Sequence, residues 1–137
     1  MRVDVLSPDS AWMTVPVDVN EHGVVLTVTY HEVRLLFQAD AGLPVEGRLA
    51  GRVGAIDVLK VGHHGSHTAT SDDWLDELRP HDAVISVGAH NKYGHPDPAV
   101  VARLLAHGIR VRRTDRDGTV TYETDGQRAH SDFRHHD

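Results

Sequence analysis

The sequence contains no cysteine, so it can form neither a disulfide nor a thiolate metal site. Any metal ion would therefore bind through nitrogen and oxygen ligands. No apolar run approaches the ~20 residues that a membrane-spanning helix needs, and no signal-peptide pattern opens the chain. The sequence as given therefore predicts a soluble chain that makes no membrane contact of its own.

An excess of positive charge is also missing. Lys and Arg number 14 against 20 Asp and Glu, which gives a net charge of −6 with neutral histidine. That balance disfavours a general nucleic-acid coat protein, whose surface would be basic. A nuclease remains open, because bound divalent ions would supply positive charge locally.

The motifs of several catalytic classes are absent. There is no Gly-x-Ser-x-Gly elbow, no P-loop, no Gly-x-Gly-x-x-Gly and no His-Glu-x-x-His. Histidine, in contrast, is frequent, with 12 residues in a chain of 137. His130, His135 and His136 lie in a polar segment without periodicity, so residues 127–137 are predicted to be a disordered His-rich tail.

Residues 1–126 fit one layered α/β domain. Helices are predicted near 44–52, 71–79 and 97–107, the last two beginning at the capping residues Ser71 and Asp97. A hairpin is expected around His31-Glu32, and a second one around Asp117-Gly118. Helices between strands indicate an α/β fold, a mixed sheet with flanking helices. The β-rich runs are 1–6, 24–30, 33–37, 56–61, 83–87, 109–113 and 119–123.

Polar side chains follow three successive strands of this predicted sheet. Neutral imidazole and carboxylate are common metal ligands, and loops at strand ends carry the sites of α/β proteins. An aspartate and histidines at these ends therefore suggest a metal-dependent hydrolase. The residues concerned are Asp40, then His63, His64 and Ser66, and finally Asn91, Lys92 and His95.

Each of these residues also has a simpler interpretation. Asp40 could cap a turn, the two adjacent histidines could bond to backbone in a polar loop, and His95 could merely precede a helix. In an extended segment His63 and His64 would point to opposite faces, so one of them at most faces a given metal. His63 directly extends the strand and is therefore favoured as the ligand, which gives His64 a supporting position. His95 could bind metal, donate a proton or stabilise a transition-state oxygen.

Four segments resemble the carboxy-terminal metallo-β-lactamase-fold domain of ComEC-type competence proteins, which form the DNA-uptake channel of transformable bacteria. The segments are 58–66, 85–88, 91–96 and 113–119, and the likeness runs from about residue 3 to 126. The resemblance implies a four-layer αββα sandwich and a hydrolase site for one or two divalent ions, Zn or Mn.

The same resemblance implies roles for particular residues. In the family the carboxylate at the position of Asp40 bridges the metals, and a histidine of the double-histidine loop, here His63, looks like a ligand. The histidine of the Gly-His-Pro segment, here His95, would assist phosphodiester cleavage. Supporting or substrate-contacting positions are implied for His64, Ser66, Asn91 and Lys92.

Two departures from the family pattern bear on activity. Gln38-Ala39-Asp40 stands where the family usually has Thr-Gly-Asp, and the hallmark His-x-His-x-Asp-His motif is missing. The chain therefore resembles only the second half of the domain. Asp40 and one histidine supply two ligands where a catalytic zinc needs about three. A half sandwich would also expose an apolar edge and face, which favours self-association or pairing with the missing amino-terminal half.

The sequence thus predicts a metal-dependent hydrolase, a phosphodiesterase or nuclease linked to DNA uptake, with DNA or another phosphodiester as substrate. The alternative is a non-catalytic fragment that acts as a binding or assembly module, from which the divalent metal would be absent. The resemblance places the parent family in the bacterial cell envelope, attached to the membrane.

Overall fold

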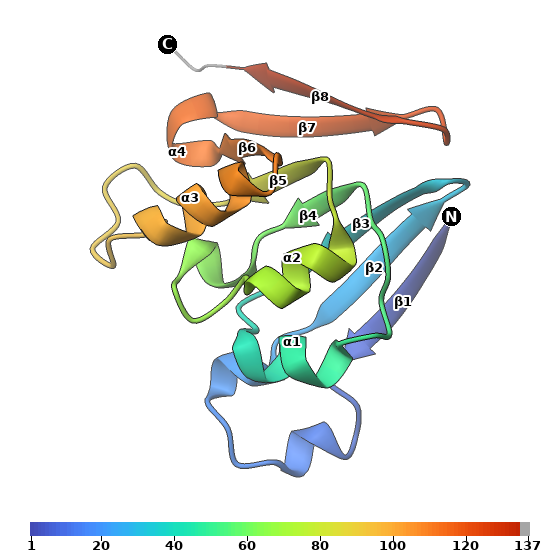
Figure 1. Cartoon of the computed structure of the whole chain (residues 1–137), viewed down its shortest axis with the longest axis vertical. Helices are drawn as coiled ribbons and strands as arrows, with labels where there is room; N and C mark the ends of the chain where they lie inside the picture. The colour runs from blue at the N-terminus through green and yellow to red at the C-terminus, as the bar shows by residue number, and fades with distance from the viewer. Residues whose placement is uncertain (135–137) are drawn as a thin grey trace.

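The computed structural model describes residues 1–134, which form two β-sheets and a set of helices (Figure 1). Within these residues no helix has both the length and the apolar character needed to cross a membrane. In chain order the elements are β1 (Arg2–Ser7), η1 (Trp12–Thr14), η2 (Val19–His22), β2 (Val25–Tyr30), β3 (Val33–Phe37), α1 (Leu43–Leu49), β4 (Val58–Lys60), η3 (Gly62–Gly65), α2 (Asp72–Leu78), β5 (Asp82–Ile85), α3 (Pro98–Ala106), β6 (Arg110–Arg113), α4 (Thr114–Asp117), β7 (Thr119–Thr124) and β8 (Ala129–Arg134).

The larger sheet is mixed and has the order β1-β2-β3-β4-β5-β6. β2 is antiparallel to both of its neighbours, β1 and β3, whereas β3 to β6 run parallel. The α/β prediction and the hairpin around His31-Glu32 are therefore confirmed, and β1 lies at one edge of the sheet. Ser71 and Asp97 also cap α2 and α3 as predicted, each accepting a backbone N–H in the first turn.

The two faces of this sheet differ in what covers them. On one face Leu36, Leu59 and Ile85 are fully buried in a core with apolar residues of α1, α2 and α3. On the other face Val120 and Tyr122 of β7 line a cavity together with Leu35, Val58 and Val84 of the sheet. The result is a layer of helices, a six-stranded sheet and a small second sheet (Figure 1).

The second face is covered only in part. Strand register places Val5, Leu26 and Phe37 opposite one another in neighbouring strands, and the row continues through Lys60 in β4. Val5 and Phe37 are 61% and 40% exposed. Side chains that share a row lie on the same face of a sheet. An apolar face is therefore open to solvent over β1 to β3.

The carboxy-terminal strands differ from the sequence prediction. The hairpin expected at Asp117-Gly118 is wrong, because β6 and β7 do not pair and α4 separates them. The predicted disordered tail is also wrong for residues 129–134, which form β8 against β7. His130 belongs to this strand, whereas His135 and His136 lie outside the described residues.

Local hydrogen bonds explain both differences. The Thr114 hydroxyl accepts from the Val87 N–H at 2.8 Å and donates to the Val87 carbonyl at 2.9 Å, which holds the chain at the end of β6. Asp117 accepts from the Arg113 N–H at 2.8 Å and closes the α4 turn. The hairpin turn lies instead at Asp125-Gly126, where Asp125 accepts two backbone N–H groups and Gly126 has a φ of 96°.

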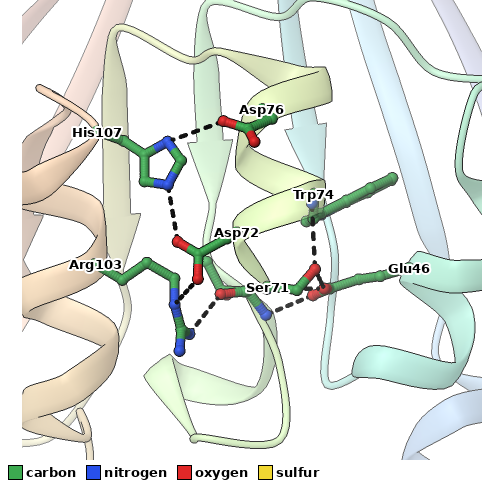
Figure 2. Close-up of polar contacts among 8 residues, drawn as sticks. Glu46, Ser71, Asp72, Trp74, Asp76, Arg103 and His107 are labelled. Carbon is green, nitrogen blue, oxygen red and sulfur yellow. Dashed lines mark hydrogen bonds and ion pairs between the residues drawn. The ribbon is translucent and has the colours of Figure 1, made fainter.

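A buried carboxylate joins α1 to the loop that precedes α2 (Figure 2). Glu46 is only 3% exposed and accepts from the Thr70 N–H at 2.5 Å, the Ser71 N–H at 3.0 Å and the Ser71 hydroxyl at 2.9 Å. The Ser71 hydroxyl also accepts from the Trp74 N–H at 3.2 Å. A single buried charge therefore determines where α2 begins.

A more exposed cluster joins α2 to α3 (Figure 2). The His107 ring contacts Asp72 through Nε2 at 2.9 Å and Asp76 through Nδ1 at 3.5 Å. Arg103 contacts Asp72 at 3.2 Å and donates to the Thr70 carbonyl at 2.8 Å. The basic side chains of α3 thus hold the amino-terminal turn of α2, where carboxylates are favoured by the helix dipole.

Replacement of Glu46 by alanine is expected to lower the free energy of unfolding by about 3 kcal/mol, because it leaves the buried N–H groups of Thr70 and Ser71 without a partner. Urea unfolding followed by tryptophan fluorescence measures this loss. Glu32→Ala is the matched control, since Glu32 is exposed and its removal should change stability by less than about 0.5 kcal/mol. Equal losses in the two variants would contradict the role given to Glu46.

Stability should also depend on pH through Asp72, because the hydrogen bond from His107 lowers the pKa of that carboxyl group, with Arg103 adding to the effect. Ionised Asp72 then stabilises the fold above about pH 4, and this contribution is lost as the pH falls through the lowered pKa. Asp72→Asn should therefore have a lower Tm near neutral pH and approach the parent once the pH falls below that lowered pKa. Asp73→Asn, on the same exposed turn, is the control. A Tm difference between Asp72→Asn and the parent that is constant across this range would exclude the mechanism.

Candidate active site

Three loops meet at one edge of the large sheet, because β3, β4 and β5 are neighbours and run parallel. Residues 38–42 follow β3, residues 61–71 follow β4 and residues 86–97 follow β5. Loops at the carboxyl ends of parallel strands form the usual ligand crevice of an open α/β sheet. All of the side chains predicted for the site lie on these loops.

The double-histidine segment turns at η3 instead of continuing β4. His63 and His64 have φ angles of 44° and 54°, in the left-handed region. The alternation of an extended strand therefore does not apply to them, although it was the reason for preferring His63 as the ligand. The His63 N–H donates to the Ala39 carbonyl at 2.9 Å, which ties this turn to the loop that carries Asp40.

Asp40 contacts His64. The Asp40 Oδ1 and His64 Nε2 atoms are 3.3 Å apart, and His64 Nδ1 lies 2.6 Å from the Ser86 carbonyl oxygen. The carbonyl can only accept, so His64 must donate from Nδ1. A neutral His64 then directs the Nε2 lone pair at a carboxylate oxygen. Such an arrangement is favourable when a proton or a cation lies between the two atoms, and a backbone carbonyl on the far ring nitrogen is typical of metal-ligating histidines.

His63 faces His95 from the neighbouring loop. Their ring centroids are 5.9 Å apart with an interplanar angle of 63°. His63 Nδ1 lies 3.3 Å from the Thr68 hydroxyl, which is itself 3.0 Å from the hydroxyl of the buried Ser66. Ser66 therefore acts through Thr68 to orient His63. These contacts place His63 beside His95 at the same edge of the sheet as the Asp40–His64 pair.

Partial burial lowers the pKa of His95, and electrostatic repulsion from His63, His64 and His67 lowers it further. His95 is therefore a neutral imidazole at neutral pH. A neutral ring has one N–H donor and one acceptor nitrogen, so it can donate a hydrogen bond to a developing oxyanion as well as accept a proton.

Asn91 organises the loop that carries His95. Its side-chain amide donates to the carbonyls of Gly88 and His95 at 3.0 and 2.7 Å, and its oxygen accepts from the N–H groups of Tyr93 and His95 at 3.2 and 2.9 Å. Asn91 was expected to support the site or to contact substrate, and these bonds give it the supporting position. Lys92 is exposed, with its ammonium 5.2 Å from the centroid of the Tyr93 ring.

Gln38 belongs to the scaffold below the site. Its side chain is buried, donates to the Ala41 carbonyl at 3.0 Å and to Glu46 at 2.7 Å, and accepts from the Trp74 indole at 3.1 Å. Gly62 lies directly against it, since a Cβ there would come within 2.6 Å of the Gln38 amide nitrogen. Gln38, which stands where the resembling family usually has threonine, therefore contributes to the support of the loop. Asp40 keeps the carboxylate of the family's Thr-Gly-Asp pattern.

Taken together, the edge of the sheet carries two contacting pairs, Asp40 with His64 and His63 with His95. Among residues 1–134 no group of three or more histidine and carboxylate side chains is arranged to hold one metal ion. Sequence reasoning identified these four residues, but it gave no role to Tyr93, although Tyr93 lies within the 91–96 segment.

Gly65 brings the two histidine loops together. It has a φ of 80°, a Cβ there would lie 2.7 Å from Pro96 Cβ, and its carbonyl accepts from the Asp97 N–H at 2.9 Å. Gly65→Ala is expected to lower the free energy of unfolding by about 2 kcal/mol and to move His95 away from His63. Urea unfolding and the histidine ring signals in NMR spectra measure the two effects.

Gly94→Ala is the matched control, because Gly94 has a similar φ of 71° but a Cβ added there would have no atom within 4 Å. It separates the cost of backbone strain from the cost of the steric clash with Pro96. The contact with Pro96 would be unimportant if both variants lost the same stability and kept the same histidine signals.

Comparison with known proteins gives a consistent picture. No protein-family model matches the chain. Competence protein ComA of Neisseria gonorrhoeae is 38% identical over 109 residues, which is 77% of this chain and 16% of that protein. Recombination protein 2 of Haemophilus influenzae is 39% identical over 101 residues, 74% of this chain and 13% of that protein.

ComE operon protein 3 of Bacillus subtilis is 50% identical over 66 residues, which is 48% of this chain. The chain spans between 8% and 16% of the length of these three relatives. The resemblance to ComEC-type competence proteins is thus supported, since the chain is similar to a segment of each of these three relatives.

Proposed function

We propose that this chain is part of a divalent-metal phosphodiesterase that acts on DNA during uptake, in a longer envelope protein of the competence type. The Asp40–His64 pair is the observation that carries the proposal. A carboxylate oxygen 3.3 Å from an imidazole nitrogen, with the other ring nitrogen fixed by the Ser86 carbonyl, is a preformed half of a metal site. The names of two relatives, a competence protein and a recombination protein, support the link to DNA.

The donor atoms of Asp40 and His64 are of the type that such a metal ion prefers, but they are fewer than the ion needs. Carboxylate oxygen and neutral imidazole nitrogen suit Zn²⁺ or Mn²⁺, and a catalytic zinc needs about three protein ligands. Asp40 and His64 supply two, and His64 takes the position for which the sequence favoured His63. The resemblance implies that the remaining ligands belong to the His-x-His-x-Asp-His segment, which this chain lacks. When bound, the ion supplies Lewis acidity toward a phosphoryl oxygen.

His95 has the properties of a transition-state stabiliser. Because its pKa is lowered, little of the protonated ring is present at neutral pH, so protonation of a leaving group would draw on a minor species. Donation of a hydrogen bond to a phosphoryl oxygen needs only the neutral ring. His63, oriented by Thr68, borders the same space and would position either His95 or the substrate.

A second candidate function follows from the open sheet face. Val3 and Val5 on the edge strand are 51% and 61% exposed, and Phe37 continues the same apolar face. Contiguous exposed apolar surface of this kind is typical of an interaction site. The chain would then be an assembly module that pairs with another copy or with a separate amino-terminal half, without metal of its own.

Metal titration separates these functions. Mn²⁺ or Zn²⁺ binding, measured by calorimetry on the full chain, should weaken at least about tenfold in Asp40→Asn and His64→Gln, since each removes one ligand. His63→Gln is the matched control and should keep most of the affinity. Equal weakening in all three histidine and aspartate variants would contradict the assignment of His64.

Removal of metal tests the second candidate function, the assembly module. If dialysis against a chelator leaves the fold and the oligomeric state unchanged, and no metal rebinds, the assembly module is the better description. Retention of stoichiometric metal together with metal-dependent cleavage of a phosphodiester would support the enzyme.

A further inference from the structure

An exposed aromatic ring borders the candidate site. Tyr93 is 70% exposed, and its ring stacks on His95 with 6.0 Å between the centroids and an interplanar angle of 19°. The ring contributes nothing to the core, so most of its surface is available to a molecule outside the folded chain.

The backbone that carries Tyr93 is held in place by Asn91. The Asn91 amide accepts from the N–H groups of Tyr93 and His95 and donates to the carbonyls of Gly88 and His95. Four hydrogen bonds from one amide keep this short segment in a single turn. A ring presented in this way binds a flat partner with little loss of conformational freedom.

Lys92 adds a positive charge at the same place. Its ammonium lies 5.2 Å from the Tyr93 ring centroid, and the side chain is exposed. A cation–π contact at an exposed site is weak, so the ammonium can leave the ring for an anion at little cost. Tyr93 and Lys92 therefore place an aromatic ring and a mobile ammonium group side by side.

We propose that Tyr93 and Lys92 form a subsite for single-stranded polynucleotide, in which an unpaired base stacks on the Tyr93 ring and Lys92 contacts the adjoining phosphate. The inference rests on the proposed function, whose phosphodiester substrate it narrows to an unpaired strand. Bases within a duplex have both faces covered by their neighbours, so only an unstacked base can reach the ring. With a net charge of −6 the chain has little general attraction for nucleic acid, which leaves the stacking contact as the main source of affinity.

Binding of a fluorescein-labelled oligothymidylate to the full chain, followed by anisotropy at low salt in EDTA, tests the subsite without hydrolysis. Tyr93→Ala should weaken binding by roughly 5- to 150-fold, the loss expected for one stacked base. Tyr93→Phe keeps the ring and should bind within about twofold of the parent. Because Tyr93 is exposed, neither variant should change the Tm, which is measured in parallel.

An oligomer with the same phosphates but abasic sugars separates stacking from charge. Tyr93→Ala should not change its affinity, whereas Lys92→Gln should weaken both oligomers alike and reduce the salt dependence of binding by about one phosphate contact. A duplex of the same sequence should bind more weakly than the single strand, and Tyr93→Ala should leave that affinity unchanged.

The subsite is refuted if the parent chain binds no single strand, if Tyr93→Ala binds as tightly as the parent, or if Tyr93→Ala weakens the abasic oligomer equally. Mn²⁺ binding at Asp40 and His64 is measured separately and bears on the proposed function. Tyr93-dependent binding of the single strand without any Mn²⁺ binding would refute the metal site while the subsite stands. Mn²⁺ binding that depends on Asp40 and His64, together with single-strand binding unaffected by Tyr93→Ala, would refute the subsite alone.

Discussion

The buried carboxylate of Glu46 is the interaction on which the rest of the structure depends. It is a charge inside the core, stabilised by hydrogen bonds from the neutral donors of Gln38, Thr70 and Ser71. A buried charge is tolerated only when nearly all of its acceptor positions are used. The residues that donate to Glu46 are therefore fixed, and they lie at the ends of β3 and of the loop before α2.

The residues that bond to Glu46 are connected to the candidate site by short stretches of chain. Gln38 is two residues from Asp40, and Thr70 ends the polar loop that begins at His63 and His64. Gly62 passes within contact of the Gln38 amide, and the His63 N–H is bonded to the Ala39 carbonyl. The loops that carry the candidate ligands are thus attached to one polar network below them. That rigidity is what a preformed metal or substrate site requires.

The sequence predicted the parts of this arrangement that depend on local patterns. The β2–β3 hairpin, the caps at Ser71 and Asp97 and the strand ends that carry Asp40, His63 and His95 all follow from residue type and spacing. Parallel order then explains why these strand ends meet, because successive strands joined by helices lie side by side.

The sequence failed where tertiary contacts decided between equivalent local signals. Asp117-Gly118 and Asp125-Gly126 are the same dipeptide, yet only the second forms the hairpin turn, since Thr114 anchors the first region to Val87. The contact of His64 with Asp40 could not be foreseen either. It depends on a left-handed turn at two non-glycine residues, which is rare in general and is fixed here by packing around Gly65.

The amide of Gln38 has a consequence for how homologous sequences can vary. Its nitrogen donates to Glu46 and its oxygen accepts from the Trp74 indole, so no other side chain of equal length satisfies both partners. A threonine at this position, as the resemblance implies for the wider family, is too short to reach the indole. Positions 38, 46 and 74 should therefore co-evolve, and an alignment in which glutamine alternates with threonine at position 38 should show a matching exchange of tryptophan at position 74.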